Sequence, residues 1–292
     1  NRELYCSTGV WRIVFNKHNI YNAKQNGKWI YLNKNGKHIN EYEYDSINFG
    51  LLWGSGYDIV YKQSKCGLVD SLGNPATSVL YEEIYEVFGD IFAKKDNYWG
   101  ILGKNDEWII KPGFNFIYEF YNGLAVADQN DKWGLLKKDG TWKINNDYEE
   151  LIYDGSNSIL VITNDYETGI MDTLGNWILQ PEYDYIWNYK NSIFIARKDD
   201  ISGLINLKGE WLCEFTYPYV WHYSHDLFEY DNDGNYGLMD NTGNVLRDYE
   251  FDEIGYMWDG YAYFIENGKY GIIDSLGEII YEAIDEEEPF YY

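Results

Sequence analysis

Histidine and carboxylate side chains carry most of the reactive chemistry available to this sequence. The four histidines are His18, His38, His222 and His225, and the last two lie next to Asp226. Two ligands three residues apart come together on a helix, and the turn residues around this segment argue against one. We therefore predict histidines in solvent-facing loops, with neither a metal site nor a general base.

The segment Asp231-Asn232-Asp233-Gly234-Asn235 resembles the start of a calcium-binding loop. The glutamate that closes such a loop is missing at the required spacing. The segment also falls where the internal repeat of the chain requires a hairpin turn. We predict a turn at this place rather than a metal site.

Motifs of catalysis are absent from the sequence. It contains no Walker loop, no HExxH, no GxSxG and no Rossmann glycine pattern. Its 48 acidic residues form many carboxylate pairs, but none stands out as the pair at defined separation that glycoside hydrolysis requires. Cys6, Cys66 and Cys213 fit neither a CxxC site nor a disulfide framework, which predicts packed or free thiols. We expect no enzymatic activity, no catalytic residue, no cofactor and no metal.

The net charge of −25 limits the possible partners. A strongly acidic surface repels phosphate backbones and anionic membranes, and no run of about 18 apolar residues is present. We therefore predict no nucleic-acid binding and no membrane insertion, and we favour a cytoplasmic location over export. The acidity either keeps an aromatic-rich chain soluble or attracts a basic protein partner.

A glycine recurs along the chain at intervals of 33 to 35 residues. Leu or Ile follows it each time, and a second glycine comes six residues after it, with Asp106 as the one departure. A period of this length is typical of solenoids, propellers and stacked arrays. The reference glycines are Gly67, Gly100, Gly134, Gly169, Gly203, Gly237 and Gly271.

Aromatic and aliphatic residues keep the same period and predict the core of each repeat. A tryptophan starts the return strand in four repeats, an aromatic ring comes 14 residues after the reference glycine, and an aliphatic residue follows three residues later. Stacked repeats build a continuous core from such positions. The predicted core residues include Trp108, Trp142, Trp177, Trp211, Tyr148, Tyr183, Ile186 and Ile254.

The segments Lys132-Trp133-Gly134, Asn176-Trp177-Ile178 and 180–186 resemble the bacterial WG-repeat (KWG) family. The resemblance spans roughly residues 27 to 285 and implies an all-β, non-enzymatic scaffold. Tryptophan stands before the reference glycine only at Trp99 and Trp133, which departs from the family pattern.

The repeat divides the chain into an N-terminal cap strand region (1–26), an array of about eight units (27–285) and an acidic tail (286–292). The expected fold is all-β, built from 34-residue β-hairpin or meander repeats. An open superhelical solenoid is favoured over a closed β-propeller, because four-stranded blades usually need about 40–45 residues.

Binding is expected from the irregular segments that follow the aliphatic positions, since array proteins place recognition on variable residues of a constant scaffold. One hypothesis is a partner protein, with an immunity-type binder of a basic toxin as its specific form; another is a glycan that stacks on exposed rings. The salt dependence of binding distinguishes these two hypotheses, because ionic screening weakens contacts with a basic protein but not ring stacking on a neutral glycan. The candidate residues are Tyr118, Tyr121, Trp187, Tyr189, Trp221, Tyr223, Tyr256 and Trp258.

Overall fold

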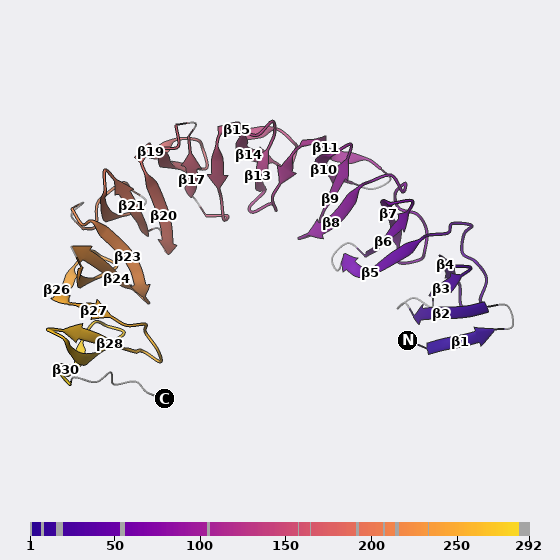
Figure 1. The fold of residues 1–292 in the computed structure, drawn as a ribbon. Coiled ribbons are helices and arrows are strands. Elements are labelled where there is room, and N and C mark those ends of the chain that lie inside the picture. The colour runs from indigo at the N-terminus through magenta and orange to yellow at the C-terminus, as the bar shows by residue number, and fades with distance from the viewer. Residues whose placement is uncertain are drawn as a thin grey trace. The chain divides into compact units, whose positions relative to one another are not determined.

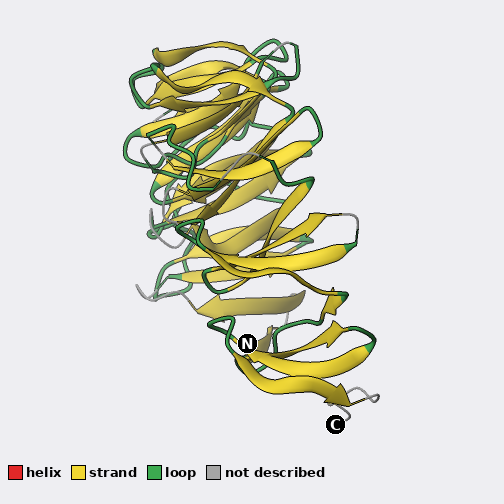
Figure 2. Cartoon of the chain, turned by 90° about the vertical axis from the view of Figure 1, so that its left-hand side faces the viewer, coloured by secondary structure: helices red, strands yellow, loops and turns green. Residues whose placement is uncertain are grey.

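Antiparallel β-strands make up the regular structure of the chain (Figure 1). The computed structural model describes residues 2–6, 9–15, 20–52, 56–103, 106–156, 158–163, 165–190, 193–206, 208–213, 216–232 and 234–285. Over these ranges every regular element is a strand, none of the sheets closes into a barrel, and Figure 2 accordingly shows strands and loops only. No helix capable of crossing a membrane occurs in this part of the chain. The predicted all-β repeat fold is confirmed.

The chain forms two compact units, Asn1–Gly155 and Ser156–Tyr292. In the first unit, successive sheets use successive stretches of sequence. They are β1 (Arg2–Cys6), β2 (Gly9–Phe15), β3 (Tyr21–Gln25) and β4 (Lys28–Leu32); β5 (Ser46–Leu52), β6 (Tyr57–Lys62) and β7 (Lys65–Asp70); β8 (Glu83–Val87), β9 (Asp90–Lys95), β10 (Tyr98–Leu102) and β11 (Trp108–Phe114); and β12 (Phe116–Ile117), β13 (Leu124–Asp128), β14 (Trp133–Lys137) and β15 (Trp142–Tyr148), after which β16 (Glu150–Ile152) ends the unit.

The second unit repeats the same plan. Its strands are β17 (Ser158–Ile162), β18 (Thr168–Asp172) and β19 (Trp177–Tyr183); β20 (Tyr185–Lys190), β21 (Ile193–Lys198) and β22 (Ile201–Asn206); β23 (Tyr219–Ser224), β24 (Leu227–Asn232), β25 (Asn235–Asp240) and β26 (Val245–Phe251); and β27 (Glu253–Ile254), β28 (Tyr261–Glu266), β29 (Lys269–Asp274) and β30 (Ile279–Asp285).

The ends of the predicted array fall within this plan as follows. The boundary between residues 26 and 27 lies in the turn of the β3–β4 hairpin, where Gln25 pairs with Lys28. The predicted acidic tail, 286–292, lies outside the described residues.

The reference glycine lies where the return strand arches over its neighbour. In the β14–β15 pair, Trp133 pairs with Tyr148 but Leu135 pairs with Ile144, so the return strand holds two extra residues opposite Gly134. A Cβ atom at Gly134 would lie 2.7 Å from the backbone nitrogen of Asn146. Side chains do not tolerate so short a contact with backbone, so this position requires glycine because of close approach.

An acidic or amide side chain closes the turn that carries the second glycine. Asp70 Oδ1 accepts hydrogen bonds from the backbone N–H groups of Leu72 and Asn74, at 2.9 and 2.8 Å. The same pair of bonds recurs in other repeats, at Asn33, Asp172, Asn206, Asp240 and Asp274. Side chains of this type favour turns through such bonds. Part of the large acidic content is therefore structural.

The return-strand tryptophans cover the edge of the core instead of filling its centre. Trp108, Trp142 and Trp177 are half-buried, and Trp211 is 38% exposed. Three of them pack on the aromatic ring of the preceding repeat, with ring centroids 5.6 Å apart for Tyr81–Trp108, 5.7 Å for Phe114–Trp142 and 6.2 Å for Tyr183–Trp211. These pairs join neighbouring repeats within each unit.

The aliphatic side chains fill the space between sheets, as expected of stacked repeats. One cluster joins Phe92 and Ile101 of one sheet to Ile117 and Ala127 of the next. Of the other predicted core residues, Tyr183 and Ile186 are buried, whereas Tyr148 and Ile254 are half-buried.

Candidate functional site

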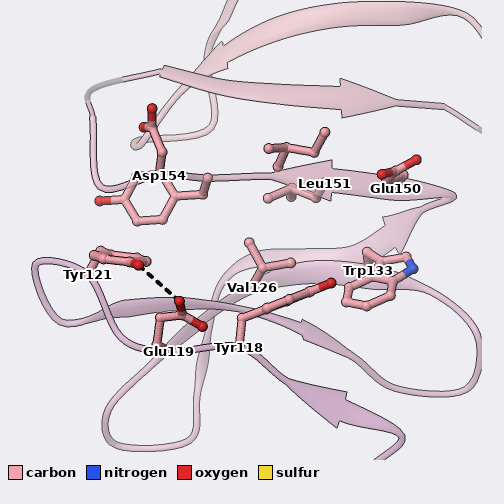
Figure 3. Close-up of a pocket in the computed structure, with 10 residues that line it drawn as sticks. Tyr118, Glu119, Tyr121, Val126, Trp133, Glu150, Leu151 and Asp154 are labelled. Carbon is pink, nitrogen blue, oxygen red and sulfur yellow. Dashed lines mark hydrogen bonds between the residues drawn. The ribbon is translucent and has the colours of Figure 1, made fainter. Parts of the chain in front are cut away.

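A groove of about 450 Å³ in the first unit includes two of the predicted contact rings, Tyr118 and Tyr121. It lies between the sheet β12–β15 and the strand β16 (Figure 3). Ten residues line it: Tyr118, Glu119, Tyr121, Val126, Trp133, Glu150, Leu151, Ile152, Tyr153 and Asp154.

Aromatic and aliphatic side chains form the apolar part of the groove. Tyr118 is 48% exposed, and its ring centroid lies 5.8 Å from that of Trp133 at an interplanar angle of 32°. Val126 and Leu151, which also line the groove, are buried. The arched return strand fixes the backbone at Gly134, next to Trp133, so the indole stands on a rigid support.

Carboxylates occupy both ends of the groove. Figure 3 shows Glu150 beside Trp133 at one end and Asp154 near Tyr121 at the other. The Tyr121 hydroxyl donates a hydrogen bond to Glu119 Oε1 at 2.9 Å, which raises the pKa of Tyr121 because a phenolate would face this carboxylate. The ten lining residues include no Lys, Arg or His, so the local charge is negative.

The loop between β12 and β13 positions Tyr121. Asn122 adopts a φ of 50° and Gly123 a φ of 79°, which reverses the chain directly after the ring. The amide nitrogen of the Asn122 side chain donates to the carbonyl oxygen of Gly155 at 2.8 Å. This bond attaches the loop to the segment that follows β16.

The other predicted contact residues belong to the second unit. Trp187 and Trp221 are each 61% exposed, with ring centroids 6.2 Å apart. Tyr256 is 98% exposed and Trp258 is 84% exposed. The side chain of Tyr189 lies outside the described residues.

Tyr223 has a structural contact in addition to its predicted role. Its hydroxyl donates to the carbonyl oxygen of Gly255 at 2.5 Å, and burial raises its pKa strongly. The ring therefore joins strand β23 to the start of the next repeat.

Sequence reasoning missed Trp133 and the carboxylates Glu119, Glu150 and Asp154 as groove residues. Trp133 has been assigned only to the repeat register, yet its indole faces the groove. The sequence did contain a signal, because a tyrosine after the aliphatic position is followed by a tryptophan before the next reference glycine in two repeats, as Tyr85 with Trp99 and as Tyr118 with Trp133. The Tyr85–Trp99 ring centroids are likewise close, at 5.1 Å.

The remaining candidate motifs have structural explanations. The segment 231–235 contains the turn of the β24–β25 hairpin, where the Gly234 N–H donates to Asp231 Oδ1 at 2.8 Å, as predicted. His222 lies in strand β23 and not in a loop, which corrects the prediction, and its ring packs on Phe228. Within the described ranges, no three His, Cys, Asp or Glu side chains are arranged to hold a metal ion.

Two of the cysteines are buried free thiols, Cys66 and Cys213. Burial raises the pKa of Cys66 to about 11, so this thiol stays protonated near neutral pH. The side chain of Cys6 lies outside the described residues.

Comparison with solved structures finds low similarity over most of the chain. Kluyveromyces lactis Hsv2p is 12% identical, with a TM-score of 0.32 over 90% of this chain and 92% of that one. A eukaryotic initiation factor is 8% identical, with a TM-score of 0.40 over 97% and 90%. PorZ, a surface component of the type-IX secretion system of Porphyromonas gingivalis, is 11% identical, with a TM-score of 0.30 over 91% of this chain and 45% of that one.

Comparison with protein families is more informative, although no curated protein sequence matches the chain. The family model described as "WG containing repeat" matches residues 99–133, 169–200, 203–236 and 236–270. Each match begins at a reference glycine or at the residue before it. The four matched repeats are therefore WG repeats, and the chain belongs to the WG containing repeat family.

Proposed function

We propose that this protein is a non-catalytic interaction scaffold that binds a basic segment of a partner protein in the groove of the first unit. The observation that carries the proposal is the composition of that groove. It combines the rings of Tyr118, Tyr121 and Trp133 with three carboxylates, and no lining side chain is cationic.

Lysine and arginine side chains fit this composition. Their aliphatic stems pack on aromatic faces, and a cation over Trp or Tyr gains about 0.5–1 kcal/mol at exposed sites. An arginine also forms paired hydrogen bonds with a carboxylate, which Glu150 or Asp154 is placed to accept at the ends of the groove.

The scaffold lowers the cost of binding. The paired strands fix the backbone that carries Trp133, its indole packs near the Tyr118 ring, and the hydrogen bond to Glu119 holds the ring of Tyr121. Rings that are already ordered lose little conformational freedom when a ligand packs against them. The net charge of −25 would also accelerate encounter with a basic partner.

The proposal is tested with an arginine-rich peptide of about eight residues and its citrulline counterpart, which has nearly the same shape but no charge. Calorimetric titration should detect binding of the arginine peptide only, with an affinity that falls as NaCl is raised. Glu150→Gln and Tyr118→Ala should weaken binding, whereas Glu107→Gln, an exposed carboxylate of the same unit outside the groove, should not.

Two results would contradict the proposal. Equal binding of both peptides would show that charge recognition is absent. Binding of a neutral oligosaccharide in the groove, without dependence on salt, would replace the protein partner with a glycan.

A further inference from the structure

One position of the repeat changes its chemistry in the second unit. The residue concerned lies on the second strand of a sheet, paired with the Leu or Ile that follows the reference glycine. In chain order its occupants are Ile59, Phe92, Val126, Leu160, Ile195, Glu229 and Tyr263. Glu229 places a carboxylate where the other repeats have an apolar or aromatic side chain.

Within the described part of the chain, Glu229 has no partner for its charge. It lies between Trp221 on strand β23 and Leu238 on strand β25, each its paired neighbour across the sheet. The side chain is half-buried, and among the described residues its carboxylate accepts no hydrogen bond and forms no ion pair. Burial, with a smaller contribution from Asp231, raises the pKa of Glu229 to about 7.

The groups around Glu229 leave this charge uncompensated. Tyr223 of strand β23 is close enough for Glu229 to raise its pKa, and Tyr263 of strand β28 acts on the same phenol. On strand β25, Tyr236 pairs with Asp231. On strand β26, Arg247 pairs with Leu238 and lies closest to other carboxylates, at 3.7 Å from Glu278 and 4.0 Å from Glu250.

Trp221, the cross-strand neighbour of Glu229, belongs to a pair of exposed indoles. Trp221 is 61% exposed, and its ring lies against that of Trp187, which is equally exposed. An exposed pair of indoles, one of them the neighbour of this carboxylate, leaves both apolar surface and negative charge unsatisfied. An ammonium group on an aliphatic stem satisfies both, through an ion pair and through contact with the indole faces.

We propose that Glu229, Trp221 and Trp187 form a binding site for an alkylammonium group, of the kind carried by a lysine side chain or a free polyamine. The site is separate from the groove of the first unit and does not depend on its function. A neutral sugar would not need the carboxylate, and an anion would be repelled by it. Because the ammonium pairs with the ionised carboxylate, binding weakens as the pH falls below about 7.

The test follows the indole N–H signals of Trp187 and Trp221 by NMR during titration of the intact chain with n-butylammonium at pH 8. Both signals should shift with a millimolar Kd, and n-butanol, which has a similar stem without the charge, should leave them unchanged. Repeating the titration at pH 5.5 should weaken binding at least about tenfold, because more than nine-tenths of a carboxyl with a pKa of about 7 is then protonated.

Three variants locate the site. Glu229→Gln should abolish binding and its pH dependence. Glu229→Leu restores the apolar residue of other repeats, so this variant should fold normally and should also lose binding. Asp226→Asn changes an exposed carboxylate in the turn of the same hairpin and should bind like the wild type. Wild-type affinity in both Glu229 variants, or equal shifts with n-butanol, would overturn the proposal.

Spermidine and Nα-acetyl-lysine amide distinguish the source of the ammonium group. Tighter binding of spermidine would identify a polyamine site, and tighter binding of the lysine derivative would identify a lysine side chain. Failure of both to compete with n-butylammonium would also count against the proposal.

Discussion

The groove of the first unit and the Glu229 region of the second unit use equivalent positions for different chemistry. Tyr118 and Trp221 both follow the aliphatic position, and Val126 and Glu229 both pair with the residue after the reference glycine. In the first unit the floor is apolar and the carboxylates lie at the ends of the groove. In the second unit the carboxylate of Glu229 occupies the position equivalent to Val126. The repeat therefore fixes where side chains stand while leaving their chemistry free to change.

The largest effect is expected from disturbing the backbone feature that both regions share, the close approach of the return strand to the reference glycine. Gly134→Ala should destabilise the fold by about 3 kcal/mol, because its Cβ would lie 2.7 Å from a backbone nitrogen of the return strand. Urea unfolding measures the change. Gly113→Ala is the matched control, since the nearest atom to its Cβ would be the end of the Gln129 side chain at 3.6 Å, and it should be nearly neutral. A similar loss in both variants would refute the close-approach argument.

Tryptophan substitutions compare a ring that joins repeats with a ring that faces solvent. Trp142→Ala should cost roughly 2 kcal/mol, about half the usual cost of a fully buried ring, because Trp142 is half-buried against Phe114. Trp221→Ala should cost less than about 0.5 kcal/mol, since its ring is largely exposed. Thermal melting of both variants provides the measurement, and equal losses would show that Trp221 is also structural.

The pH dependence of stability should distinguish Glu229 from the apolar residue Val126 at the equivalent position of the first unit. The pKa of Glu229 rises to about 7 in the folded state, so between the ordinary carboxyl pKa and pH 7 the folded chain binds more protons than the unfolded chain. Stability contributed by protonated Glu229 is therefore lost as the pH rises, by on the order of 2 kcal/mol between pH 5 and pH 8.

Glu229→Gln should remove this contribution. The variant should match the wild type at pH 5 and be more stable than the wild type at pH 8, as measured by denaturant unfolding at both pH values. If the two proteins differ by the same amount at pH 5 and pH 8, Glu229 does not titrate in this range.

The smallest expected effect concerns the rim of the first-unit groove. Glu150→Gln should lower the affinity for the arginine-rich peptide about threefold to tenfold, which corresponds to about 1 kcal/mol for an exposed charge pair. It should also reduce the slope of affinity against salt concentration. An unchanged salt slope would mean that Glu150 does not contact the peptide.

Much of the fold could be predicted because its signals are local. The period of glycine, the turn residues and the alternating apolar residues are each read within one repeat, and they indicated antiparallel strands in stacked repeats. The turn-closing role of Asp70 and its equivalents could also have been recognised, because a short side chain three residues before the second glycine recurs in most repeats.

The sequence by itself thus determined the strands, the turns and the repeat family. Only the tertiary structure decided which rings face solvent, since the half-burial of Trp142 and the exposure of Trp221 depend on contacts with neighbouring repeats. The same holds for the groove, where Tyr118 and Trp133 meet Glu150 across separate strands, and for Glu229, whose unpaired charge appears only once the strands are in register. The physical reason is that burial and pairing arise from residues distant along the chain, whereas strand and turn propensities arise from adjacent ones.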